Sequence, residues 1–297
     1  AFLRYYIMAT RKQITKDYLF KEIKTFVKEG IDVFNLLNNL ETYAAVYAAL
    51  GNADDEKWNT DKDTRNAISI LKVLQATQWK SLAMVADHKF APAVFSRLLD
   101  AIITISFRYN VIAKRQTNEM EKVYSNAAIN LYKSTMPNIN TVLNDLKPIY
   151  VNDEEFRNYF ELKDFDTDNS TDKKLARYTL YKIESQMHDG AKVDFEYDNG
   201  TIEHILPVSH PEVWQDNFTE EQFQKNVFKL GNLTLLEASK NNKIAANNCY
   251  AEKKVVYAGS KYALTKKIDA DDWTPEKIKH RQAQLGKIAA TVWRIQF

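Results

Sequence analysis

Residues that end helices and strands are scarce in this chain, and this scarcity constrains its fold more than any other feature. The 297 residues include only seven glycines and six prolines, while 45% of the residues are hydrophobic. Long stretches therefore lack the residues that commonly form turns, and such stretches favour helices where apolar residues recur every three or four positions. We predict a mainly α protein with a substantial core.

Residues 1–190 are predicted to form a helical domain, the middle region of a longer protein. Within Lys16–Glu29 the apolar residues recur at helical spacing, and Thr15 is a candidate N-cap. The segment Asp32–Leu50 is rich in Leu, Ala and Tyr and is followed by a glycine. Further helices are predicted over Asp63–Gln75, Ala91–Tyr109, Asn118–Met136 and Thr171–Met187.

The pattern changes after residue 190, and residues 191–297 are predicted to form a small α+β domain. Val193–Tyr197 alternates apolar and polar residues as a half-buried strand does, and Asp198-Asn199-Gly200 is a strong turn signal. Thr274 is the candidate N-cap of a long closing helix. The remaining predicted elements are strands over Thr201–Ile205 and Lys229–Leu236 and helices over Asn241–Val256 and Pro275–Trp293.

Net charge and cysteine content narrow the classes of protein. The formal net charge is +2, so any nucleic-acid surface must be local. The single cysteine, Cys249, excludes an internal disulfide framework and a cysteine-based zinc cluster, and it fits a reducing, cytoplasmic compartment. No apolar run reaches the roughly 20 residues of a membrane span. The chain starts at Ala1 in an amphipathic stretch, and we interpret it as a fragment trimmed at its N-terminal side.

The clearest chemistry lies in Thr201-Ile202-Glu203-His204-Ile205-Leu206-Pro207 and in Leu230-Gly231-Asn232-Leu233-Thr234-Leu235-Leu236, followed by Asn241. A neutral imidazole can take a proton from water near pH 7, so His204 is the candidate general base. Glu203 offers a carboxylate, a ligand that Mg²⁺ prefers, although neighbouring residues of a strand start on opposite faces. Local twisting at the strand end would bring both side chains to one site.

This order of residues resembles the HNH (ββα-metal) nucleases, and more closely the C-terminal nuclease domain of the GmrSD family of modification-dependent restriction enzymes. The resemblance is strong over Ala176–Trp293 and loose over residues 1–175. It implies that Asn232 bridges backbone groups and holds the loop that aims His204. It also implies that Asn241, with Asn242 as its competitor, binds the cation together with Glu203.

A lysine-rich segment follows these residues. Residues 239–267 contain seven lysines and a single acidic residue, Glu252, which gives a local charge of +6. We predict that this segment contacts DNA phosphates, since lysines neutralise the backbone without reading the base sequence. The alternative is an ordinary solvated face. The candidate phosphate-binding residues are Lys240, Lys243, Lys253, Lys254 and Lys261.

The residues and the resemblance together predict a metal-dependent DNA endonuclease that uses Mg²⁺ or Mn²⁺ and a histidine base. The resemblance implies a role in bacterial defence, in which foreign DNA is cut or nicked, often DNA that carries base or backbone modifications. It also implies an upstream ParB-like domain that hydrolyses nucleotides and that this chain lacks. One alternative is a non-catalytic DNA-binding module that docks such a domain, and another is a ribonuclease with the same site.

Overall fold

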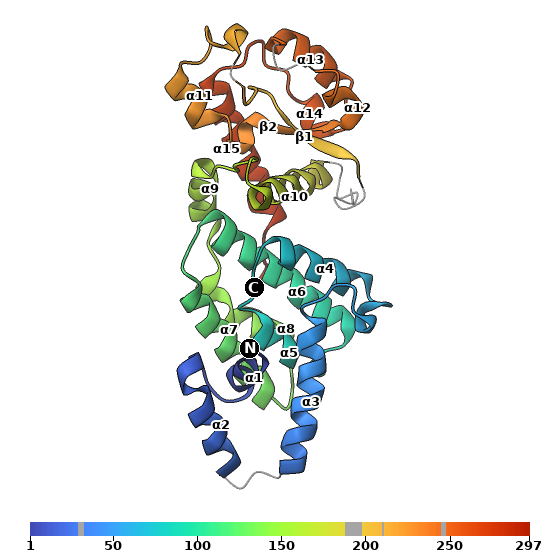
Figure 1. The fold of residues 1–297 in the computed structure, drawn as a ribbon, viewed down its shortest axis with the longest axis vertical. Coiled ribbons are helices and arrows are strands. Elements are labelled where there is room, and N and C mark those ends of the chain that lie inside the picture. Colours follow the sequence, from blue (N-terminus) through green and yellow to red (C-terminus); the bar gives the residue numbers. More distant parts are fainter. Residues whose placement is uncertain (29–32, 188–197, 210, 245–247) are drawn as a thin grey trace. The chain divides into compact units, whose positions relative to one another are not determined.

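The computed structural model describes residues 1–28, 33–187, 198–209, 211–244 and 248–297. It divides into two compact units, unit 1 with Ala1–Val151 and Ile295–Phe297, and unit 2 with Asn152–Arg294 (Figure 1). The sequence prediction put the boundary at residue 190, where strand-like patterns begin. The structure puts it earlier because the helices α9 and α10 pack against the closing helix α15 of unit 2.

Unit 1 is a helical assembly around α5 (Lys80–Lys89). All side chains from Ser81 to Ala86 are buried, and α5 contacts α1, α3, α6 and α7. The predicted helices of this region are present, but Thr15 makes no capping bond, because a 3₁₀ turn over Lys16–Tyr18 precedes α2. A π-helical stretch, Phe107–Ile112, continues α6. The helices are α1 (Phe2–Thr10), α2 (Leu19–Lys28), α3 (Val33–Ala49), α4 (Lys62–Val73), α5, α6 (Pro92–Ser106), α7 (Thr117–Lys133) and α8 (Ile139–Asp145).

Unit 2 contains a two-stranded antiparallel sheet of β1 (Gly200–His204) and β2 (Leu233–Glu237). Gly200 lies opposite Glu237, and His204 lies opposite Leu233. The first four residues of β2 are buried on both faces, because α10, α12 and α14 contact the strand. Such two-sided cover explains why β2 is almost continuously apolar. The predicted strand over residues 193–197 lies outside the described residues.

The helices of unit 2 surround this sheet, and the described chain as a whole is mainly helical, so the mainly α prediction is confirmed. The predicted helix over Asn241–Val256 is wrong in its first part: Asn241 is the last residue of α12, and the next helix, α13, begins at Tyr250. Thr274 accepts a hydrogen bond from the Lys277 amide, as expected of an N-cap. The helices are α9 (Asp153–Leu162), α10 (Ser170–Met187), α11 (Glu220–Asn226), α12 (Ala238–Asn241), α13 (Tyr250–Ala258), α14 (Ala263–Lys266) and α15 (Pro275–Val292).

A tight contact between Gly231 and α15 fixes the position of the turn that precedes β2. The predicted strand start is a 3₁₀ turn, Leu230–Asn232, and the Gly231 amide donates to the side-chain oxygen of Gln282 at 2.5 Å. A Cβ on Gly231 would collide with the carbonyl oxygen of Ile278 and lie 2.9 Å from the Gln282 nitrogen. Because both atoms belong to helix backbone, only glycine allows this approach.

One apolar cluster fills unit 2 beneath the sheet and loops. Trp273 and Tyr250 stack within it, with ring centroids 5.4 Å apart. Among the described residues, no helix is long and apolar enough to cross a membrane. The cluster consists of Ile205, Leu206, Trp214, Phe218, Phe223, Val227, Leu236, Tyr250, Tyr257, Ile268, Trp273 and Ile278.

Candidate active site

His204 is the last residue of β1, and its side chain lies in a defined environment. Its Nε2 atom is 2.9 Å from the hydroxyl oxygen of Thr167, in the loop between α9 and α10. The ring meets the edge of Phe228, with centroids 6.3 Å apart and planes at 80°. The His204 carbonyl oxygen accepts a hydrogen bond from Lys253 at 2.9 Å. Both the ring and the backbone of His204 are therefore held.

The surroundings of His204 favour its neutral form. Burial, together with the positive charges of Lys253 and Lys173, lowers the pKa of the imidazole to about 4. The imidazole is therefore neutral at pH 7, which is the form that can accept a proton. Lys173 is an exposed residue of α10, which places a cation near the histidine side of β1.

Asn232 is fully buried and joins backbone groups around the end of β1. Its Oδ1 accepts hydrogen bonds from the Leu206 amide at 2.8 Å and the Trp273 indole at 3.1 Å. Its Nδ2 donates to the carbonyl oxygens of Leu206 and Val227, both at 3.0 Å. The resemblance described above implies a bridging role of this kind for Asn232. Leu206 follows His204 by two residues, so Asn232 fixes the chain just beyond the histidine.

Replacing Asn232 with alanine is expected to lower the free energy of unfolding by about 2–4 kcal/mol, because buried partners lose their hydrogen bonds. Urea denaturation measures this change. Asn226 is the matched control, since its side chain makes a single exposed hydrogen bond to the Gln222 carbonyl. Asn226→Ala should stay within about 0.5 kcal/mol of the parent protein. Equal losses in the two variants would contradict the assigned role of Asn232.

Glu203 lies on the opposite side of β1 from the His204 ring. Its carboxylate accepts hydrogen bonds from the Lys253 ammonium and the Tyr257 hydroxyl, both at 2.8 Å and both from α13. The Glu203 and Lys253 side chains are 8% and 2% exposed. The expected twist that would bring Glu203 and His204 to one site is therefore not observed, because the buried ion pair holds Glu203 against α13.

Asn241 ends α12 and contacts the beginning of β1. Its amide nitrogen donates to the hydroxyl oxygen of Thr201 at 2.8 Å and to the carbonyl oxygen of Ile202 at 3.3 Å. Because side chains alternate along a strand, Thr201 and Glu203 share one face of β1. Asn241 thus lies on the face of Glu203 and away from the ring of His204.

The residues predicted to bind the cation do not form a metal site in this arrangement. Among the described residues, no group of three or more His, Cys, Asp or Glu side chains is placed to hold a metal ion. The one carboxylate predicted as a ligand, that of Glu203, is neutralised by Lys253. Mg²⁺ is usually bound through one or two carboxylates. The donor set around Glu203 and Asn241 therefore does not fit the ion, and we derive no step through a metal.

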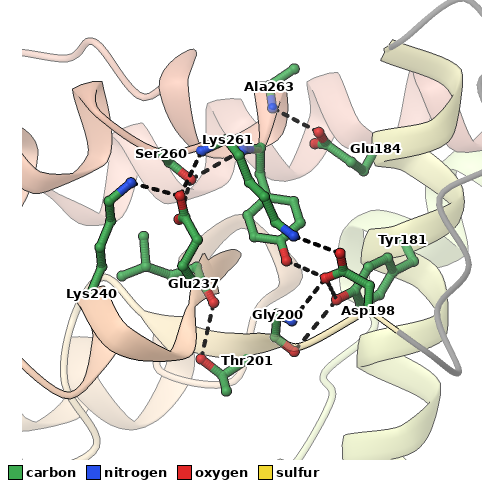
Figure 2. A network of polar contacts seen from close by, with 12 residues as sticks. Tyr181, Glu184, Asp198, Gly200, Thr201, Glu237, Lys240, Ser260, Lys261 and Ala263 are labelled. Carbon is green, nitrogen blue, oxygen red and sulfur yellow. Dashed lines mark hydrogen bonds and ion pairs between the residues drawn. The ribbon is translucent and has the colours of Figure 1, made fainter.

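Two of the predicted phosphate-binding lysines take part in a polar network at the other end of the sheet (Figure 2). Lys240 donates to Glu237 at 2.6 Å, and Lys261 donates to Asp198 at 2.6 Å. Burial raises the pKa of Glu237, but hydrogen bonds from Lys240 and its neighbours outweigh burial and lower it to about 2. Both lysines are therefore matched by ionised carboxylates, which weakens their attraction for phosphate.

The same network ties α10 to the start of β1. The Asp198 carboxylate accepts hydrogen bonds from the hydroxyl groups of Tyr181 and Tyr262 and from the Gly200 amide (Figure 2). Glu184 of α10 accepts from the Ala263 amide at 2.7 Å. These contacts fix the strand from its first residue, while Asn232 fixes the chain beyond its last.

The other three lysines predicted to contact phosphate differ in how deeply they are buried. Lys253 is inaccessible to phosphate, because its ammonium group is buried against Glu203. Lys254 lies 3.5 Å from the fully exposed Asp271. Lys243 is exposed, and no ion pair joins it to a described residue. Lys243 and Lys254 are therefore the predicted lysines that stay available at the surface.

Sequence reasoning missed the residues that hold His204 and Glu203. Thr167 and Phe228 lie outside the quoted motifs, and no local pattern connects them with the histidine. The burial of Lys253 did leave a signal. Lys253 follows Tyr250 by three residues and precedes Tyr257 by four, so a helix presents all three on one face. That face is the buried one, since both tyrosines belong to the core.

Comparison with known proteins gives one family match, which falls on unit 2. Residues 150–288 match the model described as GmrSD restriction endonucleases, C-terminal domain. The matched range begins within two residues of the start of unit 2 at Asn152. No curated protein matches the chain.

Proposed function

We propose that unit 2 is a DNA endonuclease with a histidine general base, and the match of residues 150–288 to the C-terminal domain of GmrSD restriction endonucleases supports this proposal. In this proposal β1, β2 and the helices α12 and α13 are the ββα module of an HNH-type nuclease. One observation carries the proposal: a neutral, half-buried His204 at a strand end, followed by Leu206, which the Asn232 side chain holds with two hydrogen bonds.

The proposed reaction is hydrolysis of a phosphodiester bond with His204 as the base. His204 takes a proton from a water molecule, and the resulting hydroxide attacks phosphorus in line with the leaving oxygen. The bond from phosphorus to the 3′ oxygen breaks, and that oxygen takes a proton from solvent. The products are a 5′-phosphate and a 3′-hydroxyl, as the resemblance to HNH enzymes implies. Asn232 acts through the chain beyond His204 and does not touch the substrate.

Dependence on Mg²⁺ or Mn²⁺ is part of the proposal, and it comes from the resemblance. A bound divalent cation would stabilise negative charge on the phosphate. Asn241 is the ligand that the resemblance nominates, whereas Glu203 would first have to leave its ion pair with Lys253.

DNA is the proposed substrate, and contact with its backbone is proposed for the exposed Lys243 and the partly exposed Lys254. Lys173 adds a cation close to His204. Action on modified phage DNA, and regulation by an upstream ParB-like nucleotide-hydrolysing domain, are proposed by resemblance to the family. Salt-dependent binding would accompany any such contact, since each phosphate that is neutralised releases counterions.

Incubation of supercoiled plasmid with the full chain in Mg²⁺, in Mn²⁺ and in EDTA tests this function. We expect nicked or linear plasmid in at least one metal lane and intact plasmid in EDTA. Binding of labelled DNA is measured in parallel by fluorescence anisotropy at several salt concentrations. Intact plasmid in every lane, together with salt-sensitive binding, would overturn the nuclease proposal in favour of the non-catalytic DNA-binding module.

The pH dependence of cleavage should report the low pKa of His204. The base is lost as pH falls through about 4, the pKa of the buried imidazole. A histidine with an ordinary pKa near 6.5 would be about 90% protonated at pH 5.5. We expect kcat/KM to change less than about twofold between pH 7.5 and 5.5, with circular dichroism confirming that the fold persists. A decline with a midpoint near 6.5 would contradict the assignment.

A further inference from the structure

We propose that Thr167 is a positioning residue of this site, whose hydroxyl oxygen accepts the Nε2 proton of His204 and so leaves Nδ1 as the basic atom. The inference rests on the proposed role of His204 as the base and adds which atom takes the proton and what selects it. Thr167 lies 37 residues before His204, outside both strands and outside the motifs that carry the resemblance.

The contact between the two side chains restricts the tautomer. The Thr167 hydroxyl oxygen is 2.9 Å from Nε2, and Thr167 is 7% exposed. A neutral imidazole carries one N–H donor and one acceptor nitrogen. If the hydroxyl donated to Nε2, Nδ1 would hold the proton and neither nitrogen would be free to act as a base. The opposite sense leaves a lone pair on Nδ1, and no hydrogen bond joins Nδ1 to a described residue.

The chain just before Thr167 is anchored. Phe165, two residues earlier, is completely buried, and its amide donates to the Phe228 carbonyl at 2.8 Å. Asp164 bridges to Lys229, whose ammonium also lies 2.9 Å from the Asp164 carboxylate. The segment is thus fastened to residues 228 and 229, next to the ring of Phe228 that contacts His204.

This arrangement makes the loop between α9 and α10 a fixed wall of the site. The hydroxyl has a defined position because its backbone is anchored, so it can select one orientation of the imidazole ring. Hydrogen bonding to the second nitrogen is a general means by which proteins set a histidine tautomer. The remaining nitrogen then has a fixed direction toward the reacting water.

Three variants test the inference. Thr167→Val removes the hydroxyl at nearly constant shape, and Thr167→Ser keeps it. Thr179→Val is the matched control: Thr179 is also buried, but its hydroxyl bonds within α10 to the Leu175 carbonyl at 2.7 Å. Urea denaturation of all three variants establishes that they are folded under the assay conditions.

The first readout is the tautomer itself, measured by ¹⁵N NMR of imidazole-labelled protein at pH 7, with His204 assigned from its absence in His204→Ala. We expect the proton on Nε2 in the parent protein, in Thr167→Ser and in Thr179→Val, and a mixture of tautomers in Thr167→Val. A proton on Nδ1 in the parent protein, or an unchanged tautomer in Thr167→Val, would overturn the inference. This readout does not need cleavage, so it decides the tautomer even if the proposed nuclease function fails.

The second readout is the steady-state kinetics of plasmid cleavage. Thr167→Val should lower kcat by about 10- to 100-fold with little change in KM. A wrongly oriented base slows proton transfer but leaves substrate binding unchanged. Thr167→Ser should recover kcat to within about threefold, and Thr179→Val should match the parent protein. A rise in KM at constant kcat would show substrate contact in place of positioning and would contradict the inference.

Discussion

Replacing His204 with alanine is expected to lower the rate of plasmid cleavage by about 100- to 10,000-fold, the usual contribution of a general base. The affinity for DNA should change little, because the proposed backbone contacts lie on Lys243 and Lys254. The fold should persist, since the apolar core of unit 2 does not include the imidazole. Cleavage of supercoiled plasmid and fluorescence anisotropy with labelled DNA measure the two quantities on the same samples.

His280→Ala provides the matched control for this experiment. His280 is an exposed residue of α15, and its removal should leave cleavage at the parent rate. A His204→Ala protein that is folded and cuts at the parent rate would exclude His204 as the base. A loss of DNA affinity equal to the loss of cleavage would assign His204 to binding.

Replacing Lys253 with methionine is expected to lower the free energy of unfolding by about 3–5 kcal/mol, because it leaves the buried carboxylate of Glu203 without its counter-charge. The Lys253 ammonium is 2.8 Å from that carboxylate, and both side chains are less than a tenth exposed. Of the hydrogen bonds that described residues make to the Glu203 carboxylate, the one from the Tyr257 hydroxyl would remain. Urea denaturation at pH 7 measures the change.

The adjacent Lys254→Met variant is the control for Lys253→Met. Lys254 is partly exposed and faces a fully exposed Asp271 at 3.5 Å, so its ion pair should contribute less than about 1 kcal/mol. The double variant Glu203→Gln/Lys253→Met removes both charges and should be more stable than Lys253→Met alone. Equal changes in the free energy of unfolding for the two lysine variants would mean that the Lys253 side chain is exposed to solvent, as its predicted contact with phosphate requires.

For the residues of the candidate active site, the sequence predicted some positions and contacts and missed others. The motif around His204 predicted a histidine at a strand end, and the resemblance implied that Asn232 bridges backbone groups. Hydrogen bonds of Asn232 to Leu206 match that expectation. The opposite faces of Glu203 and His204 also follow from strand alternation. The expected twist at the strand end is not observed, because the ion pair with Lys253 of α13 holds Glu203 on the other face.

The sequence by itself determined the mainly helical character, the two strands, the cap at Thr274 and the match of residues 150–288 to a family model. These features arise from interactions among residues that are close along the chain. Only the tertiary structure decided that Lys253 neutralises Glu203, fifty residues away, and that Thr167 meets His204. Neither contact has a local signature of its own, because a side chain's partner across the fold depends on how distant helices and strands pack.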